Sequence, residues 1–321
     1  MFKNSTNIPL SMAVWLATDN YDHSSDPKGI SVTTLLKPTK AIVLERSLPI
    51  GGEIDIADLI QAKTGNAVHD GIEQAWKTNH KAALKALGVP KGVASLVDIN
   101  PKEVIEGSLP VYMEIRSIRP IADFNLGGKF DFVMEGQLED FKTTGTYNYV
   151  HQGNAEKYVW QGSMYRWLNQ DIITNDHMKI TYLFTDWSAI KARSDSAYPQ
   201  TRILAQTFTL KSAAETERFI TTKLNEITRY TGLAQSFMPI CTKEELWQSD
   251  SVWKYYKDPT KTARSTKNFT NSSDAYTRLS ADGNVGKVIE VRGEVKYCRY
   301  CNANAVCLQA ESLQASGLLT L

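Results

Sequence analysis

"GGKFDFVMEGQLEDFKTT", residues 127–144, decides the fold prediction, because it has the pattern of two strands joined by a tight turn. Residues 129–134 and 137–143 are rich in aromatic and apolar side chains, which favour strands, and they flank Glu135-Gly136. A pair of this kind between two such runs suits a two-residue hairpin turn. The stretch therefore predicts a β-hairpin.

The register of this hairpin brings two carboxylates together. With a two-residue turn, antiparallel pairing sets Met134 against Gln137 and places Asp131 directly opposite Asp140. Side chains alternate along a strand, so Lys142 lies on the face of the two aspartates. The same face carries Lys129, and the apolar face carries Phe130, Phe132, Met134 and Phe141. A three-residue turn would instead oppose Asp131 to Phe141, and this alternative stays open.

The two aspartates at cross-strand distance repel each other unless a positive charge lies between them. A divalent cation with oxygen ligands is the simplest candidate for that charge. The neighbouring lysine would then act on whatever the cation binds. The competing interpretation is a surface hairpin with ordinary cross-strand ion pairs.

Length and composition set only broad limits. The 321-residue chain is long enough for one large domain or two, and its 42% apolar and 22% charged residues are typical of globular proteins. A net charge of +1 names no partner, because a nucleic-acid site can be local. The N-terminal apolar run is too interrupted for a secretory signal, and no run reaches about 18 apolar residues. We therefore expect a cytoplasmic protein without a membrane partner.

Changes of pattern divide the chain into a polar lead-in (residues 1–27), a core (residues 28–235) and a cysteine-containing region (residues 236–321). The expected core elements are helices over residues 54–87, with an interruption at Thr64-Gly65, and after Asn154 and Ala213, and strands after Pro110 and Met178. This order predicts an α/β fold with a mixed central β-sheet flanked by helices.

All four cysteines lie in the last quarter of the chain, as Cys241 followed by Cys298-x2-Cys301-x5-Cys307. Such spacing in a reducing compartment favours a metal site over disulfides. Four thiolates suit either a structural zinc ion or an iron–sulfur cluster, and the spacing does not separate the two. Because apolar runs are few after Leu233, we expect this region to need the metal bound by its cysteines in order to fold.

Three side chains outside the hairpin could join its charged face. His69 lies on a predicted helix, and an imidazole with two carboxylates is a recognisable ligand set for one cation. Gln161 and Tyr165 are four residues apart and so share one helix face. Ordinary packing is the alternative for all three.

Charged and aromatic residues elsewhere could contact nucleic acid. Glu114 could supply another carboxylate, or it could simply pair with the neighbouring arginines. Residues 253–269, WKYYKDPTKTARSTKNF, mix basic and aromatic side chains as single-strand binders do, although a solvated loop fits the same pattern. The candidate phosphate contacts are Arg116, Arg119, Arg166, Lys191 and Arg193.

Taken together, the motifs resemble the RecB-like branch of the PD-(D/E)XK nuclease superfamily. The resemblance rests on His69 followed by Gly128-Lys-Phe-Asp131, Asp140-Phe-Lys142 and Gln161-x3-Tyr165. The cysteines resemble those of CRISPR-associated and helicase-fused members, which hold a [4Fe–4S] cluster. The match covers residues 28–235 by motif order, plus the cysteine tail. It implies a restriction-endonuclease-like core with a C-terminal cysteine metal-binding subdomain.

The sequence departs from this family pattern in two places. Cys241 follows the core, whereas cluster-bearing relatives usually have one cysteine before it, so zinc stays open as the alternative metal. Phe130 stands where the eponymous proline would precede Asp131, although the RecB-like branch commonly has Gly-x-x-Asp. The arrangement is more similar to phage-encoded exonucleases, which would suit a phage source and a host-cytoplasm location.

The resemblance also implies roles for single residues. The implied ligands of Mg²⁺ or Mn²⁺ are Asp131, Asp140, His69 and the Phe141 carbonyl. Lys142 would orient the attacking water, and Gln161 and Tyr165 would position the DNA or this lysine.

The function implied is a metal-dependent DNA nuclease, namely an exonuclease acting on DNA ends or single strands in recombination, repair or end processing. A recombination or replication protein is then a candidate partner. A catalytically silent DNA-binding or assembly protein on the same fold is one alternative, and a zinc-stapled structural protein is another. The sequence gives neither the polarity of digestion nor the oligomeric state.

Overall fold

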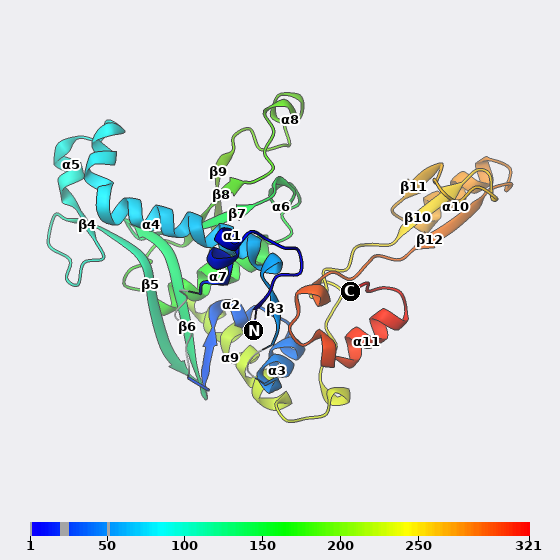
Figure 1. Cartoon of the computed structure of the whole chain (residues 1–321), viewed down its shortest axis with the longest axis horizontal. Helices are drawn as coiled ribbons and strands as arrows, with labels where there is room; N and C mark the ends of the chain where they lie inside the picture. Colours follow the sequence, from blue (N-terminus) through cyan, green and yellow to red (C-terminus); the bar gives the residue numbers. More distant parts are fainter. Residues whose placement is uncertain (1, 20–25, 50–51) are drawn as a thin grey trace. The chain divides into compact units, whose positions relative to one another are not determined.

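The computed structural model describes residues 2–19, 26–49 and 52–321. Contacts group the chain into two units, which can be followed by their colours in Figure 1. The first comprises Met1–Leu36 and Ile50–Asn225, and the second comprises Lys37–Pro49 and Glu226–Leu321. The division at residues 27 and 235 stays a prediction, because grouping by contacts does not test which segments fold alone.

A seven-stranded mixed sheet forms the centre of the first unit, with the order β4-β5-β6-β7-β8-β9 and with β2 paired to β6 (Figure 1). The pairs β4/β5, β7/β8 and β2/β6 are parallel, and the others are antiparallel. The predicted mixed α/β sheet is confirmed. Its strands are β2 (Gly29–Ser31), β4 (Val97–Ile99), β5 (Leu109–Ile121), β6 (Phe124–Met134), β7 (Gln137–Thr144), β8 (His177–Phe184) and β9 (Ile203–Thr209).

Strands β6 and β7 form the predicted hairpin in the predicted register. Met134 pairs with Gln137 across Glu135-Gly136. The φ values of these two turn residues, 51° and 74°, are both positive, as a type I′ turn requires. Continued by three residues, this register sets Asp131 opposite Asp140, so the alternative with a three-residue turn is wrong.

Strand β6 changes its partner along its length. Residues 125–127 pair with β2, whereas residues 132–134 pair with β7 on the same side of the strand. Between these two stretches the ladder is interrupted, and the sheet forks. At the fork, the backbone N–H of Phe141 donates a hydrogen bond to Asp131 Oδ2 at 2.8 Å. The fork therefore opens a space between strands that a continuous sheet would close.

Two helices flank this fork. Helix α4 (Ile60–Ala86) packs against β7 and runs through Thr64-Gly65 without the predicted interruption, because one glycine in a helix costs only about 1 kcal/mol. Helix α7 (Ala155–Leu168) packs against β6. Gly162 permits close packing of the same helix on β8, since a Cβ there would lie 2.2 Å from Met178 Sδ. The other helices outside the N-terminal region are α2 (Val32–Leu35), α5 (Lys91–Leu96), α6 (Thr146–His151), α8 (Ala189–Ser194) and α9 (Ala213–Tyr230).

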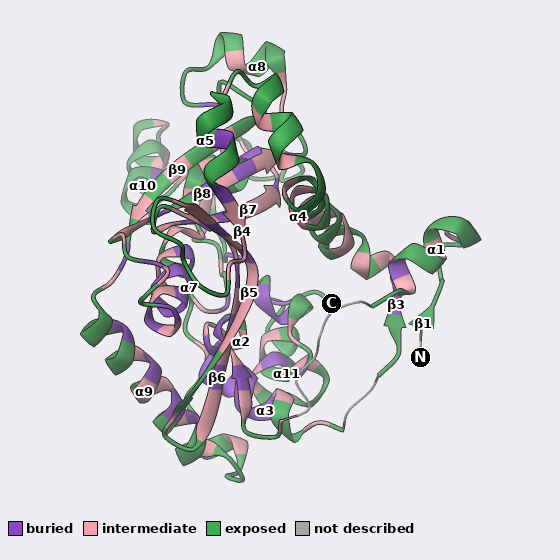
Figure 2. Cartoon of the chain, turned by 90° about the vertical axis from the view of Figure 1, so that its left-hand side faces the viewer, coloured by how far each residue is buried: buried purple, intermediate pink, exposed green. Residues whose placement is uncertain are grey.

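Burial differs between the two flanking helices. Half of α7 is buried, including Gln161 and Tyr165, whereas α4 has no fully buried residue (Figure 2). The residues with the largest fully buried side chains in this unit include Phe130, Met113, Leu138, Met164 and Tyr182. Helix α7 is therefore fixed in the core, and its polar residues are held in place by packing.

The described part of the predicted lead-in is folded onto the rest of the unit. Strand β1 (Phe2–Lys3) pairs in parallel with β3 (Ile54–Asp55), and the Ser5 N–H donates to Asp55 at 3.3 Å. Helix α1 (Leu10–Ala17) then packs against the 3-10 turn η1 (Ile56–Leu59), which leads into α4. Residues 20–25 of the predicted lead-in lie outside the described residues.

The second unit combines an N-terminal helix with the C-terminal region. In α3 (Thr39–Ser47) six successive residues, 39–44, are buried. A small core of Leu246, Val295, Cys298, Ala310 and Leu319 includes one residue of α11 (Leu308–Ala315). Short 3-10 turns lie at Gln235–Phe237 (η2), Tyr297–Tyr300 (η3) and Asn304–Val306 (η4).

A three-stranded antiparallel sheet with one helix is inserted between Cys241 and Cys298 (Figure 1). Its strand order is β11-β10-β12. Its elements are β10 (Val252–Tyr256), β11 (Lys267–Phe269), α10 (Ser272–Ala281) and β12 (Lys287–Val291). In the part of the chain that is described, no helix combines the length and apolarity needed to cross a bilayer.

Candidate active site

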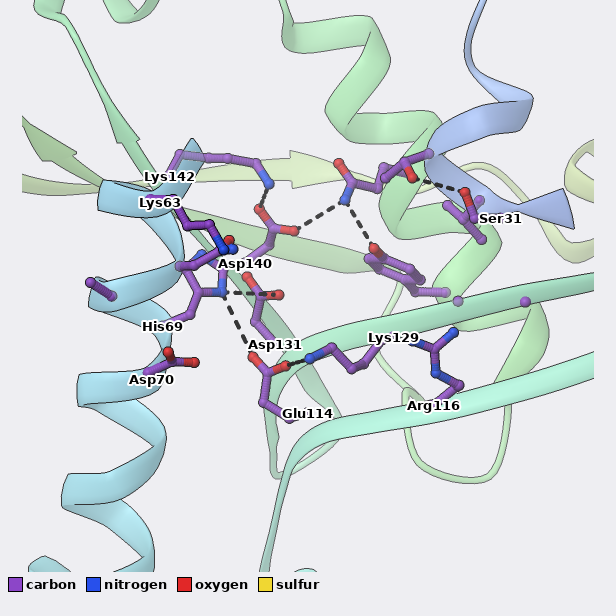
Figure 3. A pocket seen from close by; sticks show the side chains of 18 of the residues that line it. Ser31, Lys63, His69, Asp70, Glu114, Arg116, Lys129, Asp131, Asp140 and Lys142 are labelled. Atoms are coloured by element: carbon purple, nitrogen blue, oxygen red, sulfur yellow. Dashed lines mark hydrogen bonds and ion pairs between the residues drawn. The ribbon is translucent and has the colours of Figure 1, made fainter. Parts of the chain in front are cut away.

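A pocket of about 570 Å³ lies at the fork of the sheet, between α4 and α7. Strands β5, β6 and β7 direct charged side chains into it, and the end of β2 contributes Ser31 (Figure 3). The hairpin face that was predicted to carry charge is therefore a wall of this pocket.

Three carboxylates form a row across three adjacent strands. Asp131 of β6 lies between Glu114 of β5 and Asp140 of β7, since the pairs on either side of Glu114 place it opposite Asp131. Glu114 has φ 53°, in the left-handed region that a non-glycine residue in a strand rarely adopts. Such backbone strain is concentrated at functional sites. Asp140 is almost fully buried, with 1% of its surface exposed.

His69 of α4 contacts two members of this row. Its Nδ1 lies 3.7 Å from Glu114 Oε1 and 3.6 Å from Asp131 Oδ1 (Figure 3). Its Nε2 donates to the Phe141 carbonyl at 3.1 Å, because a carbonyl can only accept. Burial of the ring lowers its pKa, but the hydrogen bond with Glu114 and the charges of Asp131 and Asp140 outweigh it and raise the pKa of His69 to about 9.

The row does not carry its full negative charge at neutral pH. Burial first, and the charge of Asp140 second, raise the pKa of Asp131 to about 7. The second of these causes is the repulsion between facing aspartates that the hairpin register predicts. A positive charge placed here would return Asp131 to its ionised form.

Lys142 and Gln161 hold the carboxylate of Asp140 from two sides. The Lys142 ammonium forms an ion pair with Asp140 Oδ2. Burial opposes its charged form, yet Asp140 and Asp131 raise the pKa of Lys142, so it stays a cation. Gln161 Nε2 lies 3.4 Å from Asp140 Oδ1 and 3.0 Å from the Tyr165 hydroxyl. The pair Gln161–Tyr165 is thus brought to the site, where it orients a carboxylate.

The other charged residues predicted around the site have diverse partners. Glu114 forms an ion pair with Lys129. Of the candidate phosphate contacts, Arg116 lines the pocket. Arg119 instead lies 4.1 Å from the ring centre of Trp167, and Arg166 donates to the backbone carbonyls of Asn175 and Lys211. Lys191 and Arg193 lie on α8, which is not among the elements that line the pocket.

Trp15 and Lys63 are among the pocket residues that were not predicted. Trp15 of α1 is 37% exposed, and its approach depends on the β1–β3 pairing, which has no local sequence signal. Lys63 lies on α4 with Asn66, Ala67 and Asp70, all of which line the pocket. Their three- and four-residue spacing marks one helix face. That spacing could have identified Lys63 from the sequence.

The donor atoms of this pocket fit a divalent cation with a preference for oxygen. One ligand atom each from His69, Glu114 and Asp131 lie within 4.8 Å of one another. The Phe141 carbonyl, also at the His69 ring, adds a further oxygen. Carboxylates, a carbonyl and one imidazole suit Mg²⁺ or Mn²⁺. Glu114 therefore joins His69, Asp131 and the Phe141 carbonyl as a candidate metal ligand. Asp140 lies next to Asp131 in the row of carboxylates.

The four cysteines line one small apolar cavity within the second unit. Cys241 is held beside α11 by Gln309, whose side chain accepts from its N–H at 2.8 Å and donates to its carbonyl at 2.9 Å. Burial raises the pKa of Cys241 to about 12 and that of Cys298 to about 11, so a metal would have to displace thiol protons.

A basic side chain lies beside the cysteines. Lys40 of α3, 5% exposed, lines the same cavity and brings a positive charge to it. The choice between zinc and an iron–sulfur cluster stays a prediction.

Comparison with solved structures gives weak likenesses, two of which are described here. No family model and no curated protein match the chain. The crystal structure of SSO0001 is 14% identical and covers 64% of this chain and 78% of that chain, with a TM-score of 0.38. A phage-related exonuclease from Haemophilus somnus 129PT is 14% identical and covers 62% of this chain and 92% of that chain, with a TM-score of 0.27. Both TM-scores lie below 0.5, so neither likeness establishes a function for this chain.

Proposed function

We propose that the protein is a metal-dependent DNA nuclease whose active site is the pocket at the fork of the sheet. The observation that carries this proposal is the row of Glu114, Asp131 and Asp140 on three adjacent strands, with the cation Lys142 directly beside it. Buried carboxylates of this density are costly unless a cation is bound. Phosphodiester cleavage needs both a cation for the phosphate and a fixed positive charge near the reacting oxygens.

The division of labour follows from the contacts. The carboxylate row, His69 and the Phe141 carbonyl would hold the Mg²⁺ or Mn²⁺ ion. A cation bound there would lower the pKa of a water and neutralise the scissile phosphate. Lys142 offsets the negative charge that develops on the phosphate oxygens, and Asp140 keeps this lysine charged and in place. Gln161 in turn restrains Asp140.

The rim of the pocket supports a nucleic-acid substrate. Lys63, Arg116 and Lys129 line it, and cations at these positions suit contacts to backbone phosphates. Trp15 is partly exposed in the same wall, and a base can stack on such a ring only when it is unpaired. Single-stranded DNA or a frayed end is therefore the proposed substrate form, as an exonuclease in recombination or end processing would require.

The cysteine cavity supports a structural metal in the second unit. Cys241 must be joined to Cys298, Cys301 and Cys307 over long stretches of chain, and the apolar core there is small. We propose a [4Fe–4S] cluster as the occupant, because the four cysteines line one cavity and their sequence resembles that of the cluster-holding members of the RecB-like branch. Zinc is the alternative, and metal analysis with a visible absorption spectrum separates the two. The phage source and the protein partner rest on the sequence resemblance alone.

The test of the nuclease proposal is the loss of end-labelled linear DNA, single- and double-stranded, with Mg²⁺, Mn²⁺ or EDTA. Wild type should degrade DNA only with the metal, and Lys142→Ala should not. Lys91→Ala, a change at an exposed lysine that does not line the pocket, is the matched control and should keep most activity. DNA that is bound but never cleaved by wild type would move the function to a catalytically silent binding protein.

A further inference from the structure

The inserted sheet formed by β10, β11, β12 and α10 has no role in the proposed chemistry, yet it is a separate structural module. Its entry and exit lie against each other, since the Ser249 N–H donates to the Glu294 carbonyl at 3.2 Å. At this neck a Cβ on Gly293 would lie 1.6 Å from the Ser249 carbonyl oxygen, so only glycine fits. The chain thus leaves the cysteine region at residue 250 and returns to the same place after residue 292.

The module has a small core of its own on the side of α10. Tyr255 is fully buried and donates its hydroxyl to Asp282 at 2.6 Å. Trp253, two residues earlier, packs its ring 6.3 Å from that of Tyr276. Both side chains therefore face α10, and alternation directs Lys254 and Tyr256 to the opposite face of the sheet. That face is not covered by the helix.

The module carries more positive than negative side chains. Residues 252–292 contain eight Lys and Arg but only four Asp and Glu, whereas the whole chain has 36 and 35. Asp258 and Asp282 are paired inside the module, with Lys261 and Arg278. Among the described residues no ion pair forms at Lys254, Lys257, Arg264, Lys267 or Lys287.

These cations are grouped by the strand register. Lys254 lies between Asn268 and Ile289, and Lys287 pairs with Tyr256, so both lysines belong to the face opposite α10. Lys257 and Arg264 are in the adjoining loop between β10 and β11 and are exposed. The face opposite α10 and this loop together make a surface that carries four cations, Lys254, Lys257, Arg264 and Lys287.

We propose that this surface, centred on Lys254 and Lys287, is an accessory DNA-binding site that holds the phosphate backbone outside the catalytic pocket. A group of lysines and arginines without ion-pair partners complements a regular array of phosphates, and it reads no sequence. The site deepens the proposed function and rests on it for the choice of DNA as ligand. It would keep the enzyme on its substrate between cleavage events.

The experiment measures binding of labelled single- and double-stranded DNA by fluorescence anisotropy in EDTA, over a range of salt concentrations. The variants are Lys254→Glu with Lys287→Glu, and a deletion that replaces residues 250–292 by a short Gly-Ser linker at the neck. The control is Lys91→Glu with Lys102→Glu, two exposed lysines outside both the module and the pocket. We expect roughly tenfold weaker binding for the first two, and a salt slope smaller by about 1.5 for the double reversal.

The outcomes separate this inference from the nuclease proposal. Binding equal to wild type in the double reversal would overturn the accessory site and leave the nuclease untouched, and would point to a protein as the partner of this surface. Absence of DNA binding by wild type in EDTA would also overturn the accessory site, whereas the cleavage assay with Mg²⁺ or Mn²⁺ decides the nuclease proposal. If the deletion disturbs the fold, measured by circular dichroism, the double reversal alone decides. Cleavage of DNA at saturating concentration should be unchanged in the double reversal.

Discussion

The carboxylate pocket and the cysteine cavity are both candidate metal sites, but they are built over very different lengths of chain. Asp131, Asp140 and Lys142 come from one hairpin of 18 residues, and its register alone places them together. The cysteines are separated by up to 66 residues, from Cys241 to Cys307, with a module of their own inserted between them. One site is fixed by local pairing and the other by a long-range arrangement.

Because the two sites are held together differently, a metal would serve catalysis in the pocket and folding in the cysteine cavity. The pocket is held by the central sheet and by α7, so its geometry does not require a bound ion. The cysteine region has only a small apolar core, so an ion there would supply folding energy directly. Removing the metal should therefore stop chemistry at the first site and loosen structure at the second.

The largest effect is expected from Asp140→Asn in the pocket. It removes the partner of Lys142 and one member of the carboxylate row, and should lower metal-dependent cleavage by about 10³-fold or more. Glu139→Gln is the matched control, because the adjacent side chain bonds to Thr181 on β8 and lies on the other face of β7. The measurement is the initial rate on end-labelled DNA. Equal rates for the two variants would refute the role of the row.

The cysteine site can be broken separately by Cys301→Ser. We expect loss of bound metal and rapid proteolysis within residues 238–321, while the first unit survives digestion as a resistant fragment. Limited proteolysis followed by mass spectrometry gives the cleavage sites. A digestion pattern unchanged from wild type would show that no metal staple holds this region.

A smaller effect is expected from the packing behind the pocket. In Gly128→Ala the new Cβ would lie 2.9 Å from the Tyr165 ring and from Leu168, so Tyr165 and its partner Gln161 must shift. We expect about 1–3 kcal/mol of destabilisation and a roughly tenfold slower cleavage. Gly127→Ala is the control, since its Cβ would meet only Ile118 at 3.6 Å and a backbone oxygen at 3.9 Å. Denaturant unfolding and cleavage rates of the two variants should therefore differ clearly.

The smallest effect is the pH dependence of stability without metal. The pKa of Asp131 is raised to about 7 and that of His69 to about 9, so both groups favour the folded state in their protonated forms. Stability should fall as pH rises from about 4 to 7 through Asp131, and from about 6.5 to 9 through His69. Saturating Mn²⁺ should remove this fall. Melting temperatures in EDTA that are flat across this range, or that rise, would contradict the charge balance described here.

The parts of the fold and of the pocket that could be predicted from the sequence are those that depend on residues close together in the chain. The sheet, the hairpin register and the grouping of Asp131, Asp140 and Lys142 followed from alternation and one turn. Gln161 and Tyr165 followed from helical spacing. These are local rules, which a single sequence states in full.

The remainder required contacts between distant segments. Glu114 enters the row through the β5–β6 register and a left-handed residue, neither of which has a sequence signal. The fork depends on β2 pairing with β6 across about 95 residues. Trp15 lies on α1, which packs on η1, more than 35 residues away in the sequence. The predicted break at Thr64-Gly65 failed because helix α4 continues through it on either side with favourable residues.

The most direct test of the account is Mn²⁺ binding by the metal-free protein, followed by electron paramagnetic resonance, for wild type, Asp131→Asn and Lys142→Ala. The account predicts that Asp131→Asn loses at least about tenfold in affinity, whereas Lys142→Ala binds Mn²⁺ at least as well as wild type while its DNA cleavage is lost. Undiminished binding in Asp131→Asn, or cleavage retained in Lys142→Ala, would contradict a cation site on the carboxylate row that works with this lysine.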